Sequence, residues 1–351
     1  MVGRALLRAR SLLHRLSHPD GDQAVKVLRK DIRRLTARIE ELAAAQQEAS
    51  ELLRRADRTA MQLKLVSMLN RQQQAEIARV PELLDEARIA AHVQRAIAAA
   101  PLLTDPYEHI VVERVLPDAV YDLMMRALPP VEFFNDRDLI KQNLTFPMEV
   151  GPALSVAVWE YMDGVIARQM IRPAVLEKFH EPLQRHFESM FGPAFVERAN
   201  ALPQSVHGGR LMLRRPGYHL GPHRDPKRAM LTCLMYLARE GDSEAYGTQI
   251  FRVHGDAEAT YKTTYYPEEE GRTCELVKVV PFRANTMLVS LNSRGAHGAI
   301  IGTDAPANLE RYSYQFYVAP LNEALATLIK SLPPGQRAMW RHKAQVLPEF
   351  A

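Results

Sequence analysis

A heptad pattern of hydrophobic residues dominates the first part of the chain. Across residues 20–76 apolar side chains recur in alternating steps of four and three, and no proline or glycine follows Gly21. The strongest part of this seam consists of Leu28, Ile32, Leu35, Ile39 and Leu42. Such a pattern predicts one helix of about 80 Å that forms a coiled coil. Two interpretations stay open: oligomerisation or partner capture through the seam, or packing against the chain's own globular part.

The remaining pattern changes from helical to strand-like. Residues 77–104 are alanine-rich and predict a helical linker. Within 105–320, a strand and several helices are expected up to residue 200, followed by short alternating strands from 201 to 320. A last helix and a basic tail are expected over 321–351. We therefore predict a mainly β core with supporting α-helices, preceded by the long helix.

Composition narrows the class of protein. Of 351 residues, 47% are hydrophobic and 25% are charged, which is typical of a soluble chain with a real core. Two cysteines, Cys233 and Cys274, and no signal peptide predict a reducing, cytoplasmic location without a disulfide framework. The net charge of +4 arises largely in the first 36 residues, so nucleic acid is not an expected partner.

The first 19 residues form a basic amphipathic segment. Arginines interrupt its leucines every few positions, which excludes a signal-peptide core or a membrane span. A solvated, frayed helix and a helix weakly docked on an anionic membrane surface are both compatible with this pattern.

Three residues in the strand-rich part have the types and spacing of a metal site. If His223 and Asp225 lie on one strand, their side chains point to the same face, and His297 from a distant strand completes the set. Two imidazoles and one carboxylate leave coordination positions open and suit non-heme Fe(II). His219 is the nearest rival ligand, but only His223 has a carboxylate two positions further on.

A second group follows on the predicted strand 311–318. Alternation places Arg311 and Ser313 on one face of that strand. A guanidinium at the bottom of a pocket is a natural bidentate partner for the far carboxylate of a dicarboxylic acid.

These motifs, over about a third of the chain, resemble the Fe(II)/2-oxoglutarate-dependent dioxygenases, and within them the prolyl-hydroxylase-like branch. His223, Asp225 and His297 match the family's metal ligands, and Arg311 with Ser313 matches its Arg-x-Ser clamp for the 2-oxoglutarate C5 carboxylate. Strands similar to those of the branch are found at 232–237, 246–251 and 281–289.

The resemblance implies a fold, cofactors and a reaction. The fold is a double-stranded β-helix, or jelly roll, and the expected cofactors are Fe(II), 2-oxoglutarate and O2. Tyr236 is expected to hydrogen-bond the C5 carboxylate. The implied reaction hydroxylates a C–H bond and converts 2-oxoglutarate to succinate and CO2; a carboxylate at Asp225 favours hydroxylation over halogenation. Two departures are Tyr246 in place of a glycine and Arg214 where relatives often carry a tyrosine for the C1 carboxylate.

The substrate and one alternative function stay open. A protein side chain, a sugar, an amino acid or a small metabolite are all compatible with these residues. The alternative is a coiled-coil adaptor with an inactive jelly roll. The loop between 252 and 276 contains tyrosines and glutamates, and either closes over the substrate or forms an exposed hairpin tip.

Overall fold

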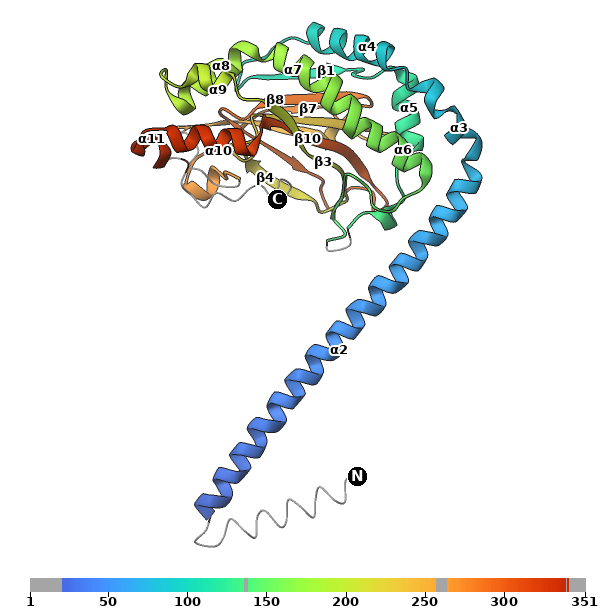
Figure 1. The fold of residues 1–351 in the computed structure, drawn as a ribbon, viewed down its shortest axis with the longest axis vertical. Coiled ribbons are helices and arrows are strands. Elements are labelled where there is room, and N and C mark those ends of the chain that lie inside the picture. The colour runs from blue at the N-terminus through green and yellow to red at the C-terminus, as the bar shows by residue number, and fades with distance from the viewer. Residues whose placement is uncertain (1–20, 136–137, 257–263, 339, 341–351) are drawn as a thin grey trace. The chain divides into compact units, whose positions relative to one another are not determined.

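The computed structural model describes residues 21–135, 138–256, 264–338 and 340 (Figure 1). The chain divides into two compact units between Lys64 and Leu65. No helix among the described residues is both long and apolar enough to cross a membrane. The predicted basic segment 1–19 and the end of the chain from 341 onward lie outside the described residues.

The predicted long helix is present as α2, Gly21–Gln72. It is interrupted at Gln73, and α3 then runs from Gln74 to Leu83 with Pro81 inside it. Proline in the last turns of a helix loses one backbone hydrogen bond but leaves the preceding turns intact. The side chains of the seam are solvent-exposed, so the coiled-coil pairing itself stays a prediction.

A helical layer joins α3 to the β core. The segment predicted as a helical linker contains α4, Glu86–Ala99, in which Ile89, Val93 and Ile97 are fully buried. The other helical elements are α5 (Asp118–Arg126), η1 (Val131–Phe133), α6 (Ala153–Tyr161), the π-helical η2 (Met162–Ile171), α7 (Arg172–Lys178), α8 (His180–Phe191), α9 (Val196–Asn200), η3 (Glu244–Tyr246), η4 (Glu268–Glu270), α10 (Asn322–Ser331) and α11 (Pro334–Ala338). The expected helical character of residues 151–200 is confirmed.

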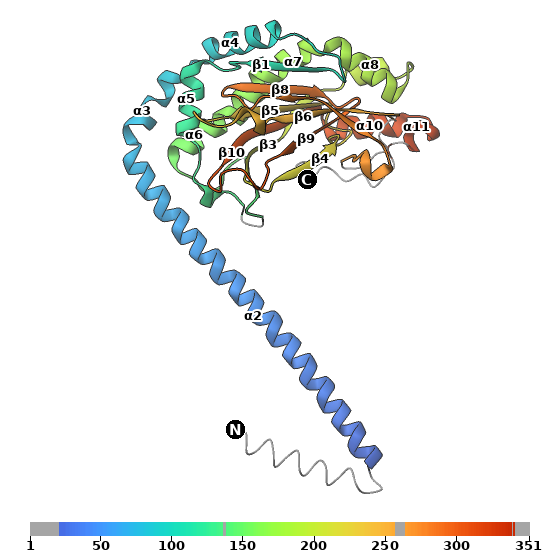
Figure 2. The ribbon, with the colours of Figure 1, turned by 180° about the vertical axis from the view of Figure 1, so that it is seen from behind.

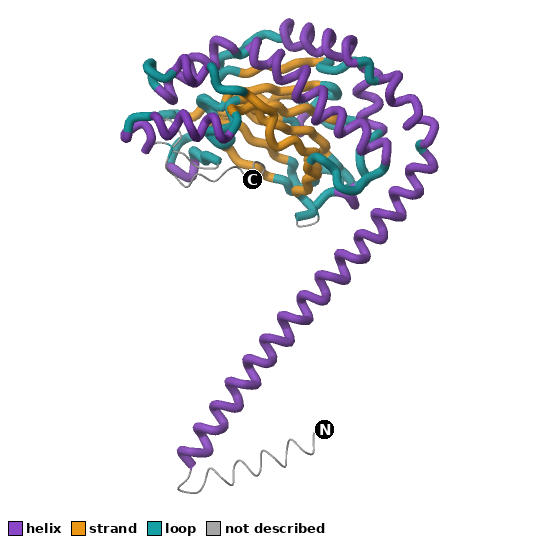
Figure 3. The backbone as a smooth tube through the Cα atoms, viewed as in Figure 1, coloured by secondary structure: helices purple, strands orange, loops and turns teal. Residues whose placement is uncertain are grey.

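Two antiparallel sheets form the core, with helices on the outer side of the larger sheet (Figures 2 and 3). The strands are β1 (His109–Glu113), β2 (Lys141–Thr145), β3 (Gln204–Arg214), β4 (His219–His223), β5 (Leu231–Leu237), β6 (Thr248–Val253), β7 (Cys274–Val280), β8 (Thr286–Leu291), β9 (Ala296–Ile300) and β10 (Arg311–Pro320). The larger sheet has the order β1-β8-β5-β10-β3-β2, and the smaller has the order β4-β9-β6-β7.

The pairing of the last eight strands identifies the predicted topology. β3 pairs with β10, β4 with β9, β5 with β8 and β6 with β7, so each strand pairs with its mirror position in the chain. Such nested antiparallel pairs, distributed over two facing sheets, are the topology of a jelly roll. The two antiparallel sheets between residues 204 and 320 therefore fit the predicted jelly-roll-like core.

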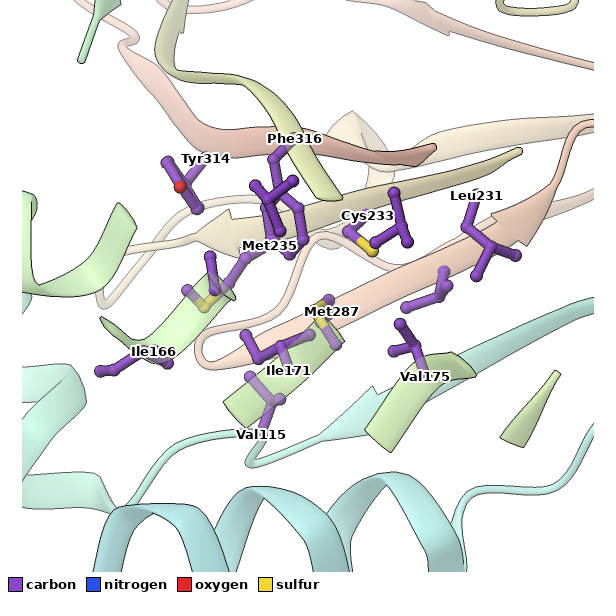
Figure 4. Packing of buried hydrophobic residues seen from close by; sticks show 14 of the residues in the cluster. Val115, Ile166, Ile171, Val175, Leu231, Cys233, Met235, Met287, Tyr314 and Phe316 are labelled. Carbon is purple, nitrogen blue, oxygen red and sulfur yellow. The ribbon is translucent and has the colours of Figure 1, made fainter. Parts of the chain in front are cut away.

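The outer face of the larger sheet packs against the helices. Alternate residues of β5, β8 and β10 point to this side, and Figure 4 shows them meeting side chains of η2 and α7. The labelled sheet residues are Leu231, Cys233, Met235, Met287, Tyr314 and Phe316, and the helical ones are Ile166, Ile171 and Val175. This packing fixes the larger sheet, so the inward-facing side chains of its strands have defined positions.

Candidate functional site

The predicted metal ligands come together at the facing ends of two strands of the smaller sheet. His223 is the last residue of β4 and lies opposite His297 of β9 in the strand register. Asp225 follows just beyond β4 and keeps the alternation of the strand. One ligand atom from each residue lies within 4.8 Å of those from the other two. The structure thus brings all three predicted ligands together.

The alternation explains why the residue between the two ligands does not join them. Arg224 points away from the cavity, and its guanidinium pairs with Asp256 at 2.7 Å and donates to the backbone oxygen of Gly295. His219, the rival ligand, is exposed and lies opposite Ile300, outside the metal group.

Hydrogen bonds orient two of the ligands. The Nδ1 of His223 lies 2.9 Å from the backbone oxygen of Gly221; as the donor there, it leaves Nε2 free to bind a metal. Asp225 Oδ2 accepts a 2.6 Å hydrogen bond from Thr232 Oγ1, and its Oδ1 accepts one from the hydroxyl of Tyr317 at 3.3 Å. Neither Thr232 nor Tyr317 was singled out from the sequence.

The ionisation of His297 and Asp225 suits metal binding. Burial, together with the neighbouring His223, lowers the pKa of His297 to about 4, so its imidazole is neutral at pH 7. Burial acts to raise the pKa of Asp225, but the adjacent histidines and the hydrogen bond from Thr232 outweigh it, and the net pKa is lowered. A carboxylate beside a neutral imidazole is the form that binds a metal.

Close contacts around Gly295 and Gly298 leave no room for a Cβ at either position beside His297. Gly295 has a φ of 61°, and a Cβ there would lie 2.2 Å from the ring of Tyr107. A Cβ on Gly298 would lie 2.7 Å from the backbone oxygen of Leu220 on the neighbouring strand. Both glycines allow β9 to approach its surroundings closely enough to place His297 at the site.

Arg311 lines the same cavity from β10, and Ser313 lies two residues further along that strand. Both side chains are buried, at 3% and 0% exposure, and Arg311 lines a cavity of about 470 Å³ that also contains the three metal ligands. Arg311 Nε donates to the backbone oxygen of Tyr246, and this hydrogen bond fixes the orientation of the guanidinium. Arg311 Nη2 and Ser313 Oγ are both buried and have no partner within the protein. Burial lowers the pKa of Arg311, which makes a bound anion favourable there.

Two further positions considered from the sequence are Tyr236, which lies beside the Arg311 guanidinium, and Arg214, which lines the cavity. The hydroxyl of Tyr236 donates to Thr248 Oγ1 at 2.7 Å, and Thr248 lines the cavity. Tyr236 thus adjoins the clamp, with its ring centroid 5.6 Å from the Arg311 guanidinium. Arg214 also lines the cavity, and its guanidinium lies 5.0 Å from the ring centroid of Tyr218.

Further cavity residues were missed by sequence spacing. Tyr266 lies with its ring centroid 5.8 Å from that of His223, and Thr264 also lines the cavity. Both belong to the long loop between 252 and 276, for which the sequence is compatible with a cover over the substrate and with an exposed hairpin tip. Lys141 and Arg210 reach the cavity from β2 and β3. Alternation along β10, extended two more steps from Ser313, could have indicated Tyr317.

No protein-family model and no curated protein sequence matches the chain. Solved structures that match include a Pseudomonas putida prolyl-4-hydroxylase, 16% identical, with a TM-score of 0.37 over 66% of this chain and 98% of that one. A prolyl 4-hydroxylase structure from Phytophthora capsici is 12% identical, with a TM-score of 0.36 over 73% and 77% of the two chains. HygX from Streptomyces hygroscopicus, solved with nickel and 2-oxoglutarate, is 10% identical, with a TM-score of 0.35 over 61% and 83%.

Proposed function

We propose that this protein is an Fe(II)/2-oxoglutarate-dependent dioxygenase that hydroxylates a C–H bond of its substrate. The observation that carries this proposal is the presence of two distinct groups in one cavity: a His-Asp-His cluster and a buried guanidinium with an unpartnered nitrogen. The cluster has the donor set of Fe(II) oxygenases. The guanidinium and the unpartnered hydroxyl of Ser313 offer hydrogen bonds to a carboxylate held deep in the cavity.

Each side chain has a separate task in this reaction. His223, Asp225 and His297 would hold Fe(II) on one side and leave its other positions open. Bound Fe(II) supplies the activation of O2, which couples conversion of 2-oxoglutarate to succinate and CO2 with hydroxylation of the substrate. Arg311 and Ser313 would bind the far carboxylate of 2-oxoglutarate and so orient its keto acid end toward the metal cluster. The burial of both groups excludes water from this contact.

The first experiment is anaerobic addition of Fe(II) and then 2-oxoglutarate to the purified protein. We expect the weak visible charge-transfer band of a chelated keto acid in the parent. His297→Ala should lose the band, whereas His219→Ala should retain it, because His219 is exposed and outside the cluster. A folded parent without a band would contradict the proposal, and so would an unchanged band in His297→Ala.

The clamp gives an independent prediction. Arg311→Gln should leave Fe(II) affinity unchanged and weaken 2-oxoglutarate binding roughly 100-fold, since a charge-assisted bidentate contact is lost in a buried place. Titration of the band with 2-oxoglutarate measures this. Equal 2-oxoglutarate affinity in Arg311→Gln and the parent would exclude Arg311 as the anchor.

We propose in addition that the seam of α2 pairs with a second copy of the chain. Its exposed residues include Ile32, Leu35, Ile39, Leu42, Leu53 and Leu63, each at least 53% exposed. In its first half, isoleucine occupies one seam position and leucine the other, a combination that favours two parallel strands in coiled coils. If the jelly roll were inactive, this pairing would be the main activity of the protein, as in the adaptor alternative.

Sedimentation equilibrium tests the pairing. The full chain should be a dimer, and Ile39→Lys should shift it toward monomer. Glu40→Lys, which places the same side chain one position further along and off the seam, should stay dimeric. A monomeric parent at high micromolar concentration would rule out self-pairing and leave a different partner protein as the occupant of the seam.

A further inference from the structure

We propose that the substrate carries an acidic group, a carboxylate or a phosphate, that binds Arg210 beside the metal cluster, with Lys141 as a second contact. This inference rests on the proposed function and names the substrate class of the same cavity. It comes from the strand register and the charges of the cavity wall.

The register arranges the cationic side chains on one wall. On the cavity face of the larger sheet, Arg311 of β10 lies opposite Arg214 of β3, which lies opposite Lys141 of β2. Four residues along β3, Arg210 lies opposite Gln315 of β10. Because every second residue of a strand faces the same side, these cations all share the inner face.

Arg210 is held in a defined position close to the metal cluster. Its Nη2 donates to Gln315 Oε1 at 2.6 Å and to the hydroxyl of Tyr317 at 3.2 Å. That hydroxyl also donates to Asp225, so a short chain of contacts links Arg210 to the metal ligand. A group bound at Arg210 would therefore place its neighbouring C–H bonds near the metal.

The charges of the cavity are unbalanced. Among the described lining residues, Lys141, Arg210, Arg214 and Arg311 are cationic, and Asp225 is the one carboxylate. Fe(II) adds two positive charges, and 2-oxoglutarate contributes two negative ones. One 2-oxoglutarate carboxylate is matched by Arg311, and the other would bind the metal. Arg210 and Lys141 line the same cavity, and the positive potential of these side chains favours an anionic group there over a neutral one.

Arg214, Arg210 and Lys141 differ in burial. Arg214 is 3% exposed and donates to the backbone oxygen of Gln142 and to Asn143 Oδ1, which engage its guanidinium inside the wall. Lys141 is exposed at the open side of the cavity. Arg210 is half-buried and lines the cavity together with the metal cluster, so a substrate in the cavity can reach its side chain.

The test measures anion binding with the 2-oxoglutarate position already filled. The full-length protein is saturated with Mn(II) and 2-oxoglutarate at constant ionic strength and titrated calorimetrically with inorganic sulfate and inorganic phosphate. We expect saturable binding in the parent, a rise in Kd of roughly tenfold or more in Arg210→Gln and a smaller rise in Lys141→Gln. Arg185→Gln is the matched control, because Arg185 is a surface cation of α8 outside this cavity. It should leave the Kd unchanged.

Two pairs of probes then distinguish the source of the acidic group. Glutamate is compared with glutamine, and phosphoserine with serine, in binding and in stimulation of succinate formation by the Fe(II) enzyme. Tighter binding of the acidic member in the parent but not in Arg210→Gln supports the proposal and tells carboxylate from phosphate. Equal binding of all acidic probes by the parent and Arg210→Gln would overturn it, as would no binding once 2-oxoglutarate is bound. A tenfold loss of 2-oxoglutarate affinity in Arg210→Gln would assign Arg210 to the co-substrate instead. Absence of the keto acid band in the parent, by contrast, would refute the oxygenase function itself.

Discussion

The proposed metal site includes a threonine that is not itself a ligand but contacts one of the proposed ligands. Thr232 is 4% exposed, donates at 2.6 Å to Asp225 and in turn accepts a hydrogen bond from Asn292 Nδ2. This contact fixes the carboxylate in one orientation and favours its charged form. We therefore expect Thr232→Val to weaken Fe(II) or Mn(II) binding about 10-fold to 100-fold, measured by metal titration.

A second buried threonine provides the control for this prediction. Thr286 on β8 is 3% exposed, does not line the cavity and donates to the backbone oxygen of Ala284. Thr286→Val should lower the melting temperature by a similar amount, because each substitution removes one hydrogen bond at a cost of about 1 kcal/mol. It should leave metal affinity unchanged. Equal metal affinities in both variants would show that Thr232 has only a structural role.

At the residue scale, site residues that lie in short motifs could be predicted from the sequence. Site residues that only the pairing of strands brings together could not. His223 and Asp225 are two positions apart, and Arg311 and Ser313 likewise, so the period of a strand was enough to predict that each pair shares a face. Arg210 contacts a residue more than a hundred positions away, and only the pairing of β3 with β10 brings the two together. No spacing rule could have predicted that pairing before the topology was known.

At the scale of elements, the proposed pairing of α2 can also be tested with a substitution that should stabilise it, at one polar residue of the seam. Gln46 occupies a position where Ile32 and Ile39 stand in earlier heptads. A polar side chain in a coiled-coil seam lowers stability while it specifies register. Gln46→Leu should therefore stabilise the dimer by about 2 kcal/mol, the contribution of one buried leucine, as measured by the concentration dependence of thermal unfolding.

The adjacent glutamine controls for helix propensity. Gln47 lies one position off the seam, and its amide donates to Glu51 on the same helix. Gln47→Leu changes the propensity of the helix as Gln46→Leu does, but it adds no buried contact between copies. A matching gain in stability from Gln47→Leu would mean that the seam is not the paired face.

The boundaries of the elements were predicted less well than their types. The long helix, the helices of 151–200 and the strands around the site were all expected. The long helix was predicted over 20–76, whereas α2 ends at Gln72 and α3 continues past Pro81 to Leu83. Proline disfavours the helix at its own amide and at the residue before it, and near a C-terminal end the local cost is small enough for packing to decide. Val80, next to it, is buried in the core cluster.

At the scale of the whole molecule, burial indicates which part of the chain forms the stable folded unit. The resemblance, which implies a strand and a helix ahead of the barrel, predicts a catalytic domain from about residue 105, but Ile89, Val93 and Ile97 of α4 are at most 1% exposed and belong to the same core cluster as the larger sheet. Asn70, near the end of α2, accepts a hydrogen bond from the backbone amide of Ala153. These contacts place the start of the stable unit close to Leu65, where the chain divides into two compact units.

Two truncations follow from this assignment. A chain that begins at Leu65 should keep the melting temperature of the site-bearing unit and the keto acid band, since no residue of the cavity is removed. A chain that begins at Asp105 also keeps every described cavity residue, yet it loses three fully buried side chains of α4. Each contributes about 1.5–3 kcal/mol, and their sum is comparable with the 5–15 kcal/mol that stabilises an ordinary domain. We expect the shorter chain to be unfolded or aggregated by circular dichroism, and a stable, band-forming product would show that α3 and α4 are dispensable.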